Sequence, residues 1–390
     1  MIMNISKKPG ISEEKMNIPL LDLQAQYKSI KKDIDKAIAR VVDSQCFILS
    51  DEVKDLEKEI AEYTGVSAAA GVASGTDALI LALRALGIGK GDAVITTPFT
   101  FFASSESISI LGARPVFVDI DPITFNIDPN KVEALLRNTH DSIRNTIKAI
   151  LPVHLYGQCA DMTRIMAIAS KYGLDVVEDS AQAIGAVHKC KKAGSFGKAG
   201  CLSFFPSKNL GGFGDGGMIV SSDIPFIEEI KKLRVHGSVK QYVHEEIGYN
   251  SRLDSIQAAI LRVKLRELDR WLEGRRAIAG RYNEAFAPLG IQLPVTGEGN
   301  THTFHQYTIA VPEREKLMAH LEAKGVSARV YYPIPLHLQE CNKDLGYKKG
   351  DFPVSEGLAQ KVLSLPVYPE LSEGEIEYII NVVKGFYGKR

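Results

Sequence analysis

Hydrophobic residues in the first two thirds of the chain follow two alternating patterns. Short continuous apolar runs predict strands at residues 66–72, 93–96, 114–118, 147–153 and 175–177. The stretches between them have apolar residues at helical spacing and predict helices at residues 77–86, 104–111, 129–136 and 162–172. Because strands that alternate with helices form a sheet covered by those helices, the pattern predicts an α/β fold with a largely parallel sheet.

The two ends of the chain depart from this alternation. Helical spacing predicts helices at residues 30–42 and 51–63, the second capped by Ser50, and a long helix at about 254–286. The rest predicts strands at 306–311 and 328–331, a helix at 314–324, a loop and two further helices. We therefore expect a disordered polar leader at 1–16, a large domain at 17–270 and a small α+β domain at 271–390.

Composition narrows the kinds of ligand that the protein can attract. The chain has 390 residues, enough for a core that buries a cofactor. It carries 47 Lys and Arg against 47 Asp and Glu, so no overall field favours nucleic acid or an acidic membrane. No apolar run approaches the roughly 18 residues that a membrane span needs. Five cysteines without CxxC spacing are typical of reduced thiols, so we expect a cytoplasmic protein without a metal site.

One lysine lies in surroundings unlike those of an ordinary surface lysine. Lys208 follows the apolar run 200–205 and precedes the glycine-rich stretch 211–217. This pattern predicts two short strands, joined by a loop that presents the amine at a sheet edge. Burial there would lower the pKa of the amine and let it bind an aldehyde cofactor covalently. From these residues alone, a solvated loop lysine remains the alternative.

Other residues could hold the remaining parts of such a cofactor. Asp179 ends a strand where ligands collect in open α/β sheets, and its carboxylate suits a pyridine nitrogen. Ser74, Gly75 and Thr76 begin a predicted helix whose N–H groups can bind a phosphate. Phe101 follows another strand, and its ring could stack on a ligand. The alternatives are a helix N-terminal acid, an ordinary helix cap and a core phenylalanine.

Together these motifs resemble a known family. They are similar to those of the pyridoxal-phosphate-dependent nucleotide-sugar aminotransferases of the DegT/DnrJ/EryC1/StrS type, from about residue 18 to residue 383. The resemblance is carried by the segments IPLLDL (18–23), SGTD (74–77), VEDSAQ (177–182), SFFPSK (203–208), GDGG (214–217), YNSRLD (249–254) and YPIPLH (332–337). It implies aminotransferase fold type I, with a mostly parallel seven-stranded sheet in the large domain and a small α+β C-terminal domain.

The resemblance also implies roles for individual residues. Lys208 would bind the cofactor covalently, Asp179 would face its ring nitrogen, and Gln182 would face its phenolic oxygen. Ser74, Gly75, Thr76 and Ser203 would hold the phosphate, and Phe101 would stack on the ring. Asn250 would reach the phosphate of the neighbouring subunit, which implies a homodimer with shared active sites.

Within the family, the motifs look closest to enzymes that aminate C3 of UDP-linked 3-keto sugars, including a 2-acetamido-3-keto uronic acid, in bacterial surface-polysaccharide pathways. Glutamate would be the amino donor, and pyridoxamine phosphate would be the intermediate form of the cofactor. Arg252 could pair with a sugar carboxylate, although relatives with neutral substrates also have an arginine at this position. Gln306 and Tyr307 would line the nucleotide side of the site from the partner subunit.

Other functions remain open at this point. One is an aminotransferase acting on a dTDP-linked 3-keto sugar or 4-keto-6-deoxy sugar. A second is a cofactor-bearing regulator or scaffold, although no basic helix-turn-helix is visible. A related sugar dehydratase would have histidine in place of Lys208, and a nicotinamide enzyme would have GxGxxG after the first strand.

Overall fold

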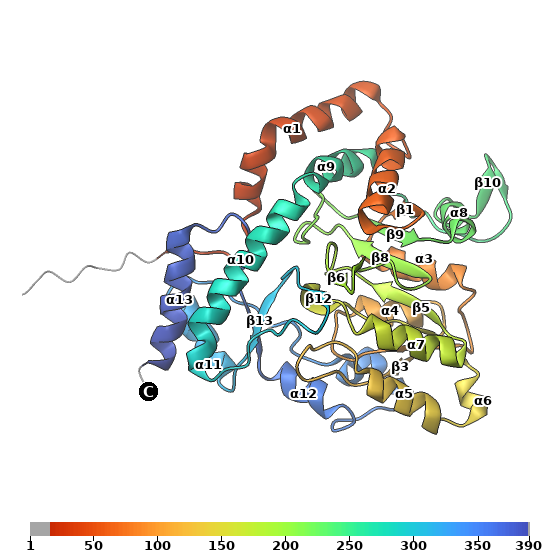
Figure 1. Ribbon diagram of the computed structural model, residues 1–390. Helices are drawn as coiled ribbons and strands as arrows, with labels where there is room; N and C mark the ends of the chain where they lie inside the picture. The colour runs from red at the N-terminus through yellow and green to blue at the C-terminus, as the bar shows by residue number, and fades with distance from the viewer. Residues whose placement is uncertain (1–15, 389–390) are drawn as a thin grey trace, which may run out of the picture.

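The computed structural model describes residues 16–388 and contains a central seven-stranded sheet (Figure 1). Most of the predicted leader at 1–16 therefore lies outside the described residues. The strands are β1 (Ala68–Val72), β2 (Ala93–Thr96), β3 (Arg114–Phe117), β4 (Ile147–Ile150), β5 (Asp175–Asp179), β8 (Ala199–Ser203) and β9 (Gly217–Ser221). They lie in the order β1-β9-β8-β5-β4-β2-β3.

Within this sheet only β9 runs against its neighbours. It is antiparallel to both β1 and β8, and the pairs from β8 to β3 are all parallel. The carboxyl ends of β1, β2, β5 and β8 therefore meet at one edge of the sheet. This arrangement confirms the predicted mostly parallel sheet.

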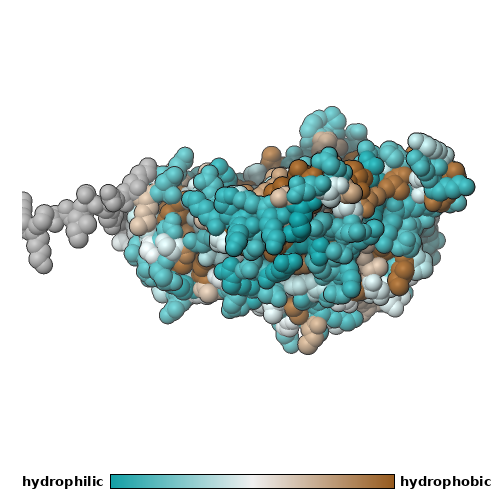
Figure 2. Space-filling view, turned by 90° about the horizontal axis from the view of Figure 1, so that it is seen from above, coloured by the Kyte–Doolittle hydropathy of each residue, from teal (hydrophilic) through white to brown (hydrophobic). Residues whose placement is uncertain are grey.

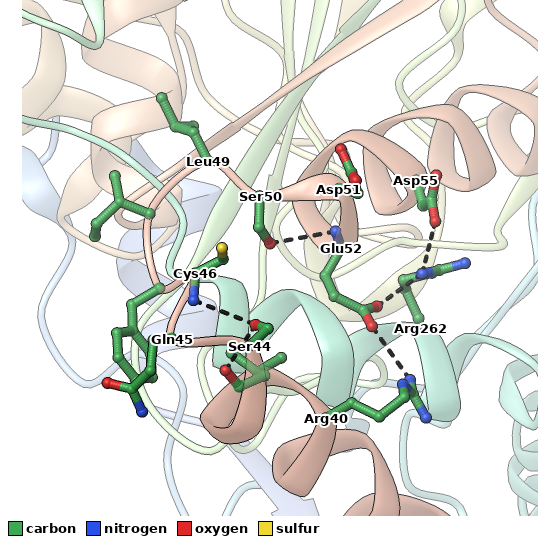
Figure 3. Close-up of a pocket in the computed structure, with 13 residues that line it drawn as sticks. Arg40, Ser44, Gln45, Cys46, Leu49, Ser50, Asp51, Glu52, Asp55 and Arg262 are labelled. Atoms are coloured by element: carbon green, nitrogen blue, oxygen red, sulfur yellow. Dashed lines mark hydrogen bonds and ion pairs between the residues drawn. The ribbon is translucent and has the colours of Figure 1, made fainter.

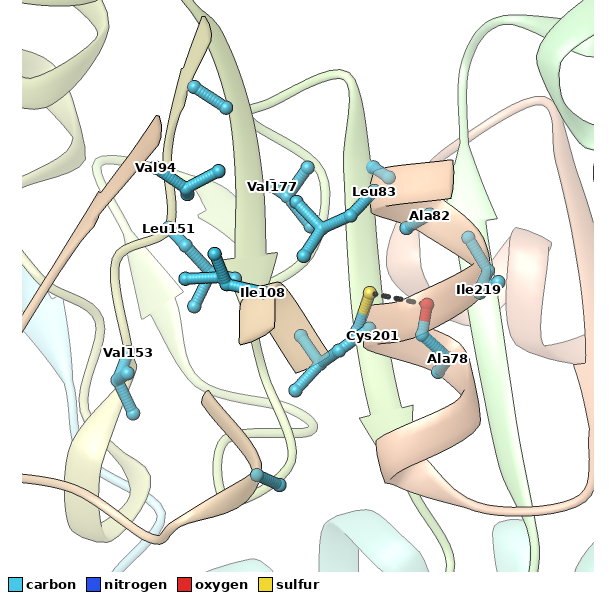
Figure 4. Close-up of a cluster of buried hydrophobic side chains, with 14 of the residues drawn as sticks. Ala78, Ala82, Leu83, Val94, Ile108, Leu151, Val153, Val177, Cys201 and Ile219 are labelled. Carbon is cyan, nitrogen blue, oxygen red and sulfur yellow. Dashed lines mark hydrogen bonds between the residues drawn. The ribbon is translucent and has the colours of Figure 1, made fainter. Parts of the chain in front are cut away.

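Helices cover both faces of the sheet because its strands are apolar on both sides. On one face lie α3 (Gly75–Ala85), α4 (Ala103–Ile110) and α8 (Ile224–Leu233). On the other lie α2 (Asp51–Thr64), α5 (Pro129–Asn138), α7 (Met162–Tyr172) and α9 (Ser255–Leu265). Alternate residues point to opposite faces, so Val177 packs with the first group and Val176 with the second. Figure 4 shows the hydrophobic core between the sheet and the helices α3, α4 and α8. In this core the Cys201 thiol lies 3.4 Å from the Ala78 carbonyl oxygen.

The C-terminal third has a hydrophobic core of its own. It packs α10 (Leu268–Phe286), α11 (Arg314–Ala323) and α13 (Glu373–Tyr387) around the antiparallel pair β13 (Tyr307–Ala310) and β14 (Val362–Leu365). Ile18 is buried in the same core. The remaining regular elements between residues 16 and 388 are α1 (Leu23–Ser44), α6 (Asp141–Arg144), α12 (Pro353–Ala359), β6 (Val187–His188), β7 (Lys191–Lys192), β10 (Ser238–Lys240), β11 (Val243–His244), β12 (Asn300–Thr301) and four short 3₁₀ helices.

Two predicted elements were wrong. The long helix at 254–286 is two helices, α9 and α10, because α9 packs on α1 and α2 whereas α10 packs on the C-terminal core. The strand at 328–331 is reduced to a single bridge between Arg329 and Ser364, and β14 was missed. Pro333 and Pro335, which cannot donate to a ladder, follow directly and end any strand there.

None of the helices between residues 16 and 388 has the length and apolar character needed to span a bilayer. Within the same residues, no group of three or more histidine, cysteine, aspartate or glutamate side chains is placed to hold a metal ion.

Candidate active site

A cavity of about 350 Å³ lies at the edge where the carboxyl ends of the strands meet. Its lining includes nine of the residues predicted from the sequence: Ser74, Gly75, Thr76, Phe101, Asp179, Gln182, Ser203, Lys208 and Gln306. These residues come from four strand ends and from the C-terminal third of the chain. The fold therefore gathers the predicted amine, carboxylate, amide and phosphate-binding groups into one place.

Lys208 lies in a tight loop between β8 and β9. Its backbone N–H donates to the Phe205 carbonyl at 2.8 Å, and the buried Lys264 ammonium donates to the Gly211 carbonyl at 2.7 Å. Gly211 is required because a Cβ there would lie 2.3 Å from the Pro206 carbonyl oxygen. Burial lowers the pKa of Lys208 to about 8, and the Asp179 carboxylate opposes that shift. Near neutral pH about a tenth of the amine is therefore in the neutral, nucleophilic form, a much larger fraction than for an ordinary lysine.

Asp179 is the last residue of β5, and its carboxylate is held at both oxygens. The Ser104 hydroxyl donates to Oδ2 at 2.7 Å, and the Ala181 N–H approaches Oδ1 at 3.2 Å. Thr100 in turn lies 3.1 Å from the Ser104 hydroxyl. Asp179 is thus part of the sheet, and the alternative of a helix N-terminal acid is wrong.

Glu178 points away from the cavity. Its two oxygens accept hydrogen bonds from the backbone N–H groups of Gly194, Phe196 and Gly197 at 2.7–2.8 Å, and His154 Nε2 lies 2.9 Å from Oε2. His154 Nδ1 accepts from the Ala160 N–H at 3.1 Å, so its proton lies on Nε2 and is donated to Glu178. Glu178 and His154 therefore brace the strand behind Asp179 and do not face a ligand.

Gln182 has a fixed amide orientation. The Tyr156 backbone N–H donates to its Oε1 at 2.8 Å, and its Nε2 donates to the Tyr332 hydroxyl at 3.1 Å. Because the oxygen faces a donor, the NH₂ group must face Tyr332 and the cavity. This orientation suits the predicted donor to a phenolic oxygen.

The phosphate side of the cavity is the N-terminus of α3. Ser74 caps this helix by accepting the Asp77 N–H at 3.0 Å, so it is a helix cap as well as a cavity residue. Gly75 packs closely on Ser203, since a Cβ on Gly75 would lie 2.6 Å from Ser203 Cβ. Free N–H groups and hydroxyls at a helix start provide donors for a phosphate.

The remaining predicted residues have different positions. Phe101 lies at the cavity mouth, 56% exposed, with its ring centroid 6.0 Å from that of Tyr332. Asn250 and Arg252 do not line the cavity of their own chain, although Ser251 between them donates to Asp77 at 2.6 Å. Tyr307 does not line this cavity: it is buried in the C-terminal core, where its hydroxyl donates to Asn283 at 2.8 Å.

Sequence reasoning missed several residues of the site. Ser104 was part of a predicted helix, and Tyr332 was quoted in a motif without a role. His305 lines the cavity, and its Nδ1 has no hydrogen-bond partner among the described residues. Burial, with help from the nearby Lys208 and Arg275, holds the pKa of His305 well below its ordinary value, so the ring is neutral. A polar residue next to the predicted Gln306 was the available signal.

A larger cavity of about 730 Å³ lies where α1 and α2 meet (Figure 3). Arg262 pairs there with Glu52 at 2.7 Å and Asp55 at 2.8 Å. It contains no predicted site residue, and its arginine is already neutralised by carboxylates. The smaller cavity therefore carries the chemistry.

The residues of the smaller cavity fit pyridoxal phosphate. They provide an amine with a lowered pKa, a held carboxylate, an amide donor and a helix N-terminus. Each matches one part of that cofactor: the aldehyde, the ring nitrogen, the phenolic oxygen and the phosphate. The fold and the site together define an aminotransferase of fold type I.

Comparison with known proteins identifies the family. A model of the DegT/DnrJ/EryC1/StrS aminotransferase family matches residues 28–384, so the chain belongs to this family. It is 50% identical to the "Pleiotropic regulatory protein" of Geobacillus stearothermophilus, over 95% of this chain and 99% of that protein. It is 46% identical to the UDP-N-acetyl-3-dehydro-alpha-D-glucosamine 3-aminotransferase of Acidithiobacillus ferrooxidans, over 94% and 97% of the two chains.

Two further curated relatives act on different nucleotide sugars. The UDP-2-acetamido-2-deoxy-3-oxo-D-glucuronate aminotransferase of Pseudomonas aeruginosa is 42% identical over 93% of this chain and 98% of its own. The dTDP-3-amino-3,4,6-trideoxy-alpha-D-glucose transaminase of Streptomyces venezuelae is 41% identical over 95% and 96%. The chain is thus a sugar aminotransferase of this family.

Solved structures support the fold and the cofactor. A DegT DnrJ EryC1 StrS aminotransferase from Brucella abortus superposes with a TM-score of 0.92 at 41% identity, covering 95% of this chain and all of that one. The ntda protein of Bacillus subtilis, solved with bound pyridoxamine phosphate, gives a TM-score of 0.88 at 31% identity, covering 97% and 86%. These findings confirm the predicted family, fold and cofactor.

Proposed function

We propose that this enzyme moves an amino group from glutamate to C3 of a UDP-linked 2-acetamido-3-keto sugar or uronic acid, in bacterial surface-polysaccharide biosynthesis. The observation that carries the transamination is the placement of Lys208 and Asp179 in one cavity. Support for the substrate comes from the two UDP-sugar 3-aminotransferases among the relatives. The cytoplasmic location expected from the sequence is part of the proposal.

Each residue has a chemical role in this reaction. When bound, pyridoxal phosphate supplies an electron sink for the carbon that loses a proton. Lys208 Nζ would hold the cofactor and would move a proton at the reacting carbon as general base and acid. Asp179 would keep the ring nitrogen protonated. Gln182 donates a hydrogen bond without adding charge.

The test is an assay with glutamate, cofactor and a panel of UDP- and dTDP-linked 3-keto and 4-keto sugars. We expect release of 2-oxoglutarate and a product whose new amine is located at C3 by NMR. Amination of a dTDP-linked 4-keto-6-deoxy sugar alone would contradict the substrate but leave the aminotransferase class intact.

A variant pair tests the role of Lys208. Lys208→Arg keeps a cation but cannot form the covalent link, so turnover should be lost while part of the cofactor binding remains. Lys198→Arg is the matched control and should retain activity. Lys198 lies just before β8 and pairs with Asp223. A fully active Lys208→Arg enzyme would refute the assignment.

The proposal includes a homodimer whose active sites are shared. Asn250 is exposed and does not line the cavity of its own chain, as expected for a residue that serves a neighbour. Phe101 and Phe205 flank the cavity and are 56% and 52% exposed. Figure 2 shows a mostly hydrophilic face interrupted by exposed hydrophobic side chains. The segment around β10 and β11 adds Tyr242 and Ile247, which are 87% and 89% exposed and available to a second copy.

Subunit mixing tests this sharing. Lys208→Ala and Asn250→Ala subunits should each be nearly inactive alone. After unfolding and refolding together, mixed dimers contain one site with both wild-type residues, so activity should recover to about one quarter of wild type. No recovery, with mixed dimers shown by mass spectrometry, would place Asn250 in the site of its own chain or outside it.

Arg252 and Gln306 are the proposed contacts to the substrate. Gln306 lines the cavity, and Arg252 pairs with no carboxylate among the described residues. If Arg252 recognises a uronic carboxylate, Arg252→Gln should raise KM for the uronic acid and leave KM for the neutral sugar unchanged. An equal rise in KM for both sugars would show that Arg252 does not recognise a substrate carboxylate.

A second candidate is a cofactor-bearing regulator. It is favoured by the printed name of the Geobacillus stearothermophilus relative, "Pleiotropic regulatory protein". A regulator of this kind would bind the cofactor but release no 2-oxoglutarate from glutamate and no keto acid from any other amino donor. A single half-reaction assay with a panel of amino acids separates the two.

A further inference from the structure

The active-site cavity is built from two walls that come from distant parts of the chain. One wall belongs to the sheet edge and includes Lys208, Asp179 and Gln182. The opposite wall belongs to the C-terminal third and consists of His305, Gln306, Tyr331 and Tyr332. A reaction between a ligand on one wall and a ligand on the other requires a constant distance between them.

Tyr156 is buried behind both walls and does not itself line the cavity. Its backbone is in the left-handed region, with φ 59° and ψ 1°. A residue with a Cβ disfavours this conformation and keeps it only where its surroundings over-determine it. The contacts of Tyr156 therefore hold it in this conformation.

Each polar group of Tyr156 contacts a different cavity residue. The backbone N–H donates to Gln182 Oε1 at 2.8 Å. The carbonyl accepts the Gln306 N–H at 3.2 Å, and the hydroxyl donates to the Tyr331 carbonyl. Burial raises the pKa of the Tyr156 hydroxyl well above its ordinary value, so the hydroxyl remains a donor. One residue thus joins the cofactor wall to two points on the opposite wall.

The neighbouring Gly157 tightens the same junction. Its carbonyl accepts hydrogen bonds from the backbone N–H of Thr303 at 2.8 Å and from the Thr303 hydroxyl at 3.1 Å. Gly157 has φ 108°, and a Cβ there would lie 2.4 Å from Thr303 Oγ1. The segment that carries His305 and Gln306 is therefore docked closely on residues 156 and 157.

We propose that Tyr156 is a positioning residue: through Gln182, Gln306 and Tyr331 it sets the separation between the cofactor wall and the substrate wall. This inference rests on the proposed function, because it takes the residues on the C-terminal wall to face the second ligand. Tyr156 contacts no reacting atom, and its effect passes through the three residues that it holds. Loss of its hydroxyl should loosen the substrate wall at Tyr331 and leave the backbone bond to Gln182 in place.

The test is Tyr156→Phe, which removes only the hydroxyl. Its ring can keep the edge-on contact with Phe125, at a centroid distance of 6.1 Å. We expect unchanged affinity for pyridoxal phosphate and a rise of about tenfold in KM for the keto sugar, the size expected for one lost buried hydrogen bond, with kcat changed much less. An unchanged KM would overturn the proposal, because a role in folding alone predicts a lower Tm and no change in KM.

Tyr282→Phe is the matched control. Tyr282 is also buried, and its hydroxyl also donates to a backbone carbonyl, that of Pro366 at 3.0 Å, but in the C-terminal core away from the cavity. It should lower Tm and leave KM unchanged. If Tyr282→Phe raises KM as much as Tyr156→Phe, the effect is general loosening and the proposal is wrong.

A second variant and a second assay cover the cases in which Tyr156→Phe does not fold or the enzyme aminates no sugar. If Tyr156→Phe does not fold, Thr303→Val removes one of the two bonds from Thr303 to Gly157 and should raise KM by a smaller factor; an unchanged KM there overturns the proposal as well. If the wild-type protein aminates no sugar, the proposed function has failed. KM for the amino donor is then measured for the same variants in the half-reaction. A normal KM for that donor in Tyr156→Phe would then overturn the positioning role separately.

Discussion

The hydroxyl of Ser104 donates a 2.7 Å hydrogen bond to Oδ2 of Asp179, and both residues are buried. Ser104 comes from α4 and Asp179 from the end of β5, so the contact joins a helix on one face of the sheet to the strand that carries the cofactor's carboxylate. A carboxylate held in this way presents one orientation to a ligand.

This contact predicts a loss of cofactor affinity in Ser104→Ala. Without the hydroxyl the carboxylate can rotate, and a hydrogen bond to a charged group is worth about 1.5–3 kcal/mol. We expect the Kd for pyridoxal phosphate to rise about tenfold or more, measured by titration of the apoenzyme. Ser107→Ala is the control, because Ser107 is buried in the same helix and its hydroxyl donates to the Ser104 carbonyl instead of to Asp179. Equal effects of the two variants would contradict the role of Ser104.

The lowered pKa of Lys208 predicts the pH dependence of cofactor uptake. Only the neutral amine attacks an aldehyde, and the pKa in the folded protein is about 8 instead of 10.5. The rate of cofactor binding by the apoenzyme should therefore rise through about pH 8 and then level off. A rate that continues to rise up to pH 10 would show that Lys208 is solvated.

The same shift predicts a change in stability with pH. Between about pH 8 and 10.5 the unfolded lysine binds more protons than the folded one, so the stability of the apoenzyme should rise with pH. Below pH 8 Lys208 is protonated in both the folded and the unfolded protein. Burying its charge then lowers the free energy of unfolding by its full amount, about 3 kcal/mol. Lys208→Met should be more stable than wild type below pH 8, and the difference should shrink towards pH 10.5 in urea titrations. A constant difference would contradict the shift.

Glu178→Gln should destabilise the protein. Both oxygens of Glu178 accept hydrogen bonds, so the NH₂ group of glutamine must face either backbone N–H groups or the His154 proton. A buried NH₂ group that faces other N–H donors lowers the free energy of unfolding by about 2–4 kcal/mol. Chemical denaturation measures the loss. Glu133→Gln, at an exposed ion pair with Lys171, should change stability by less than about 1 kcal/mol. Similar values for both variants would contradict the bracing role of Glu178.

Gly75→Ala should weaken phosphate binding. The new methyl group would lie 2.6 Å from Ser203 Cβ, which must push the start of α3 away from the cavity. The affinity for pyridoxal phosphate should fall more than the affinity for pyridoxal, measured side by side. Gly280→Ala in α10 meets nothing within 4 Å and should stabilise the helix by about 0.5–1 kcal/mol without changing either affinity. Equal losses for the two ligands would indicate that the start of α3 does not bind phosphate.

The sequence alone determined the elements whose causes are local. Helix α7 and strand β2 have the predicted bounds, and Ser50 caps α2 as predicted, because apolar periodicity and caps depend on neighbours a few residues apart. Lys208 and Asp179 could be found for the same reason: an apolar strand followed by glycines or acids marks a strand end, and the ends of parallel strands meet at one edge.

Tertiary structure alone decided everything that depends on distant partners. The break between α9 and α10 follows from the two cores on which they pack, and β14 forms because it pairs with β13. Tyr307 and its neighbour Gln306 were predicted as one pair, yet Tyr307 begins β13 and fills a core, whereas Gln306 precedes the strand and lines the cavity. The wall opposite Lys208, and the Tyr156 junction that holds it, are joined by hydrogen bonds across about 150–175 residues of chain, which no local pattern encodes.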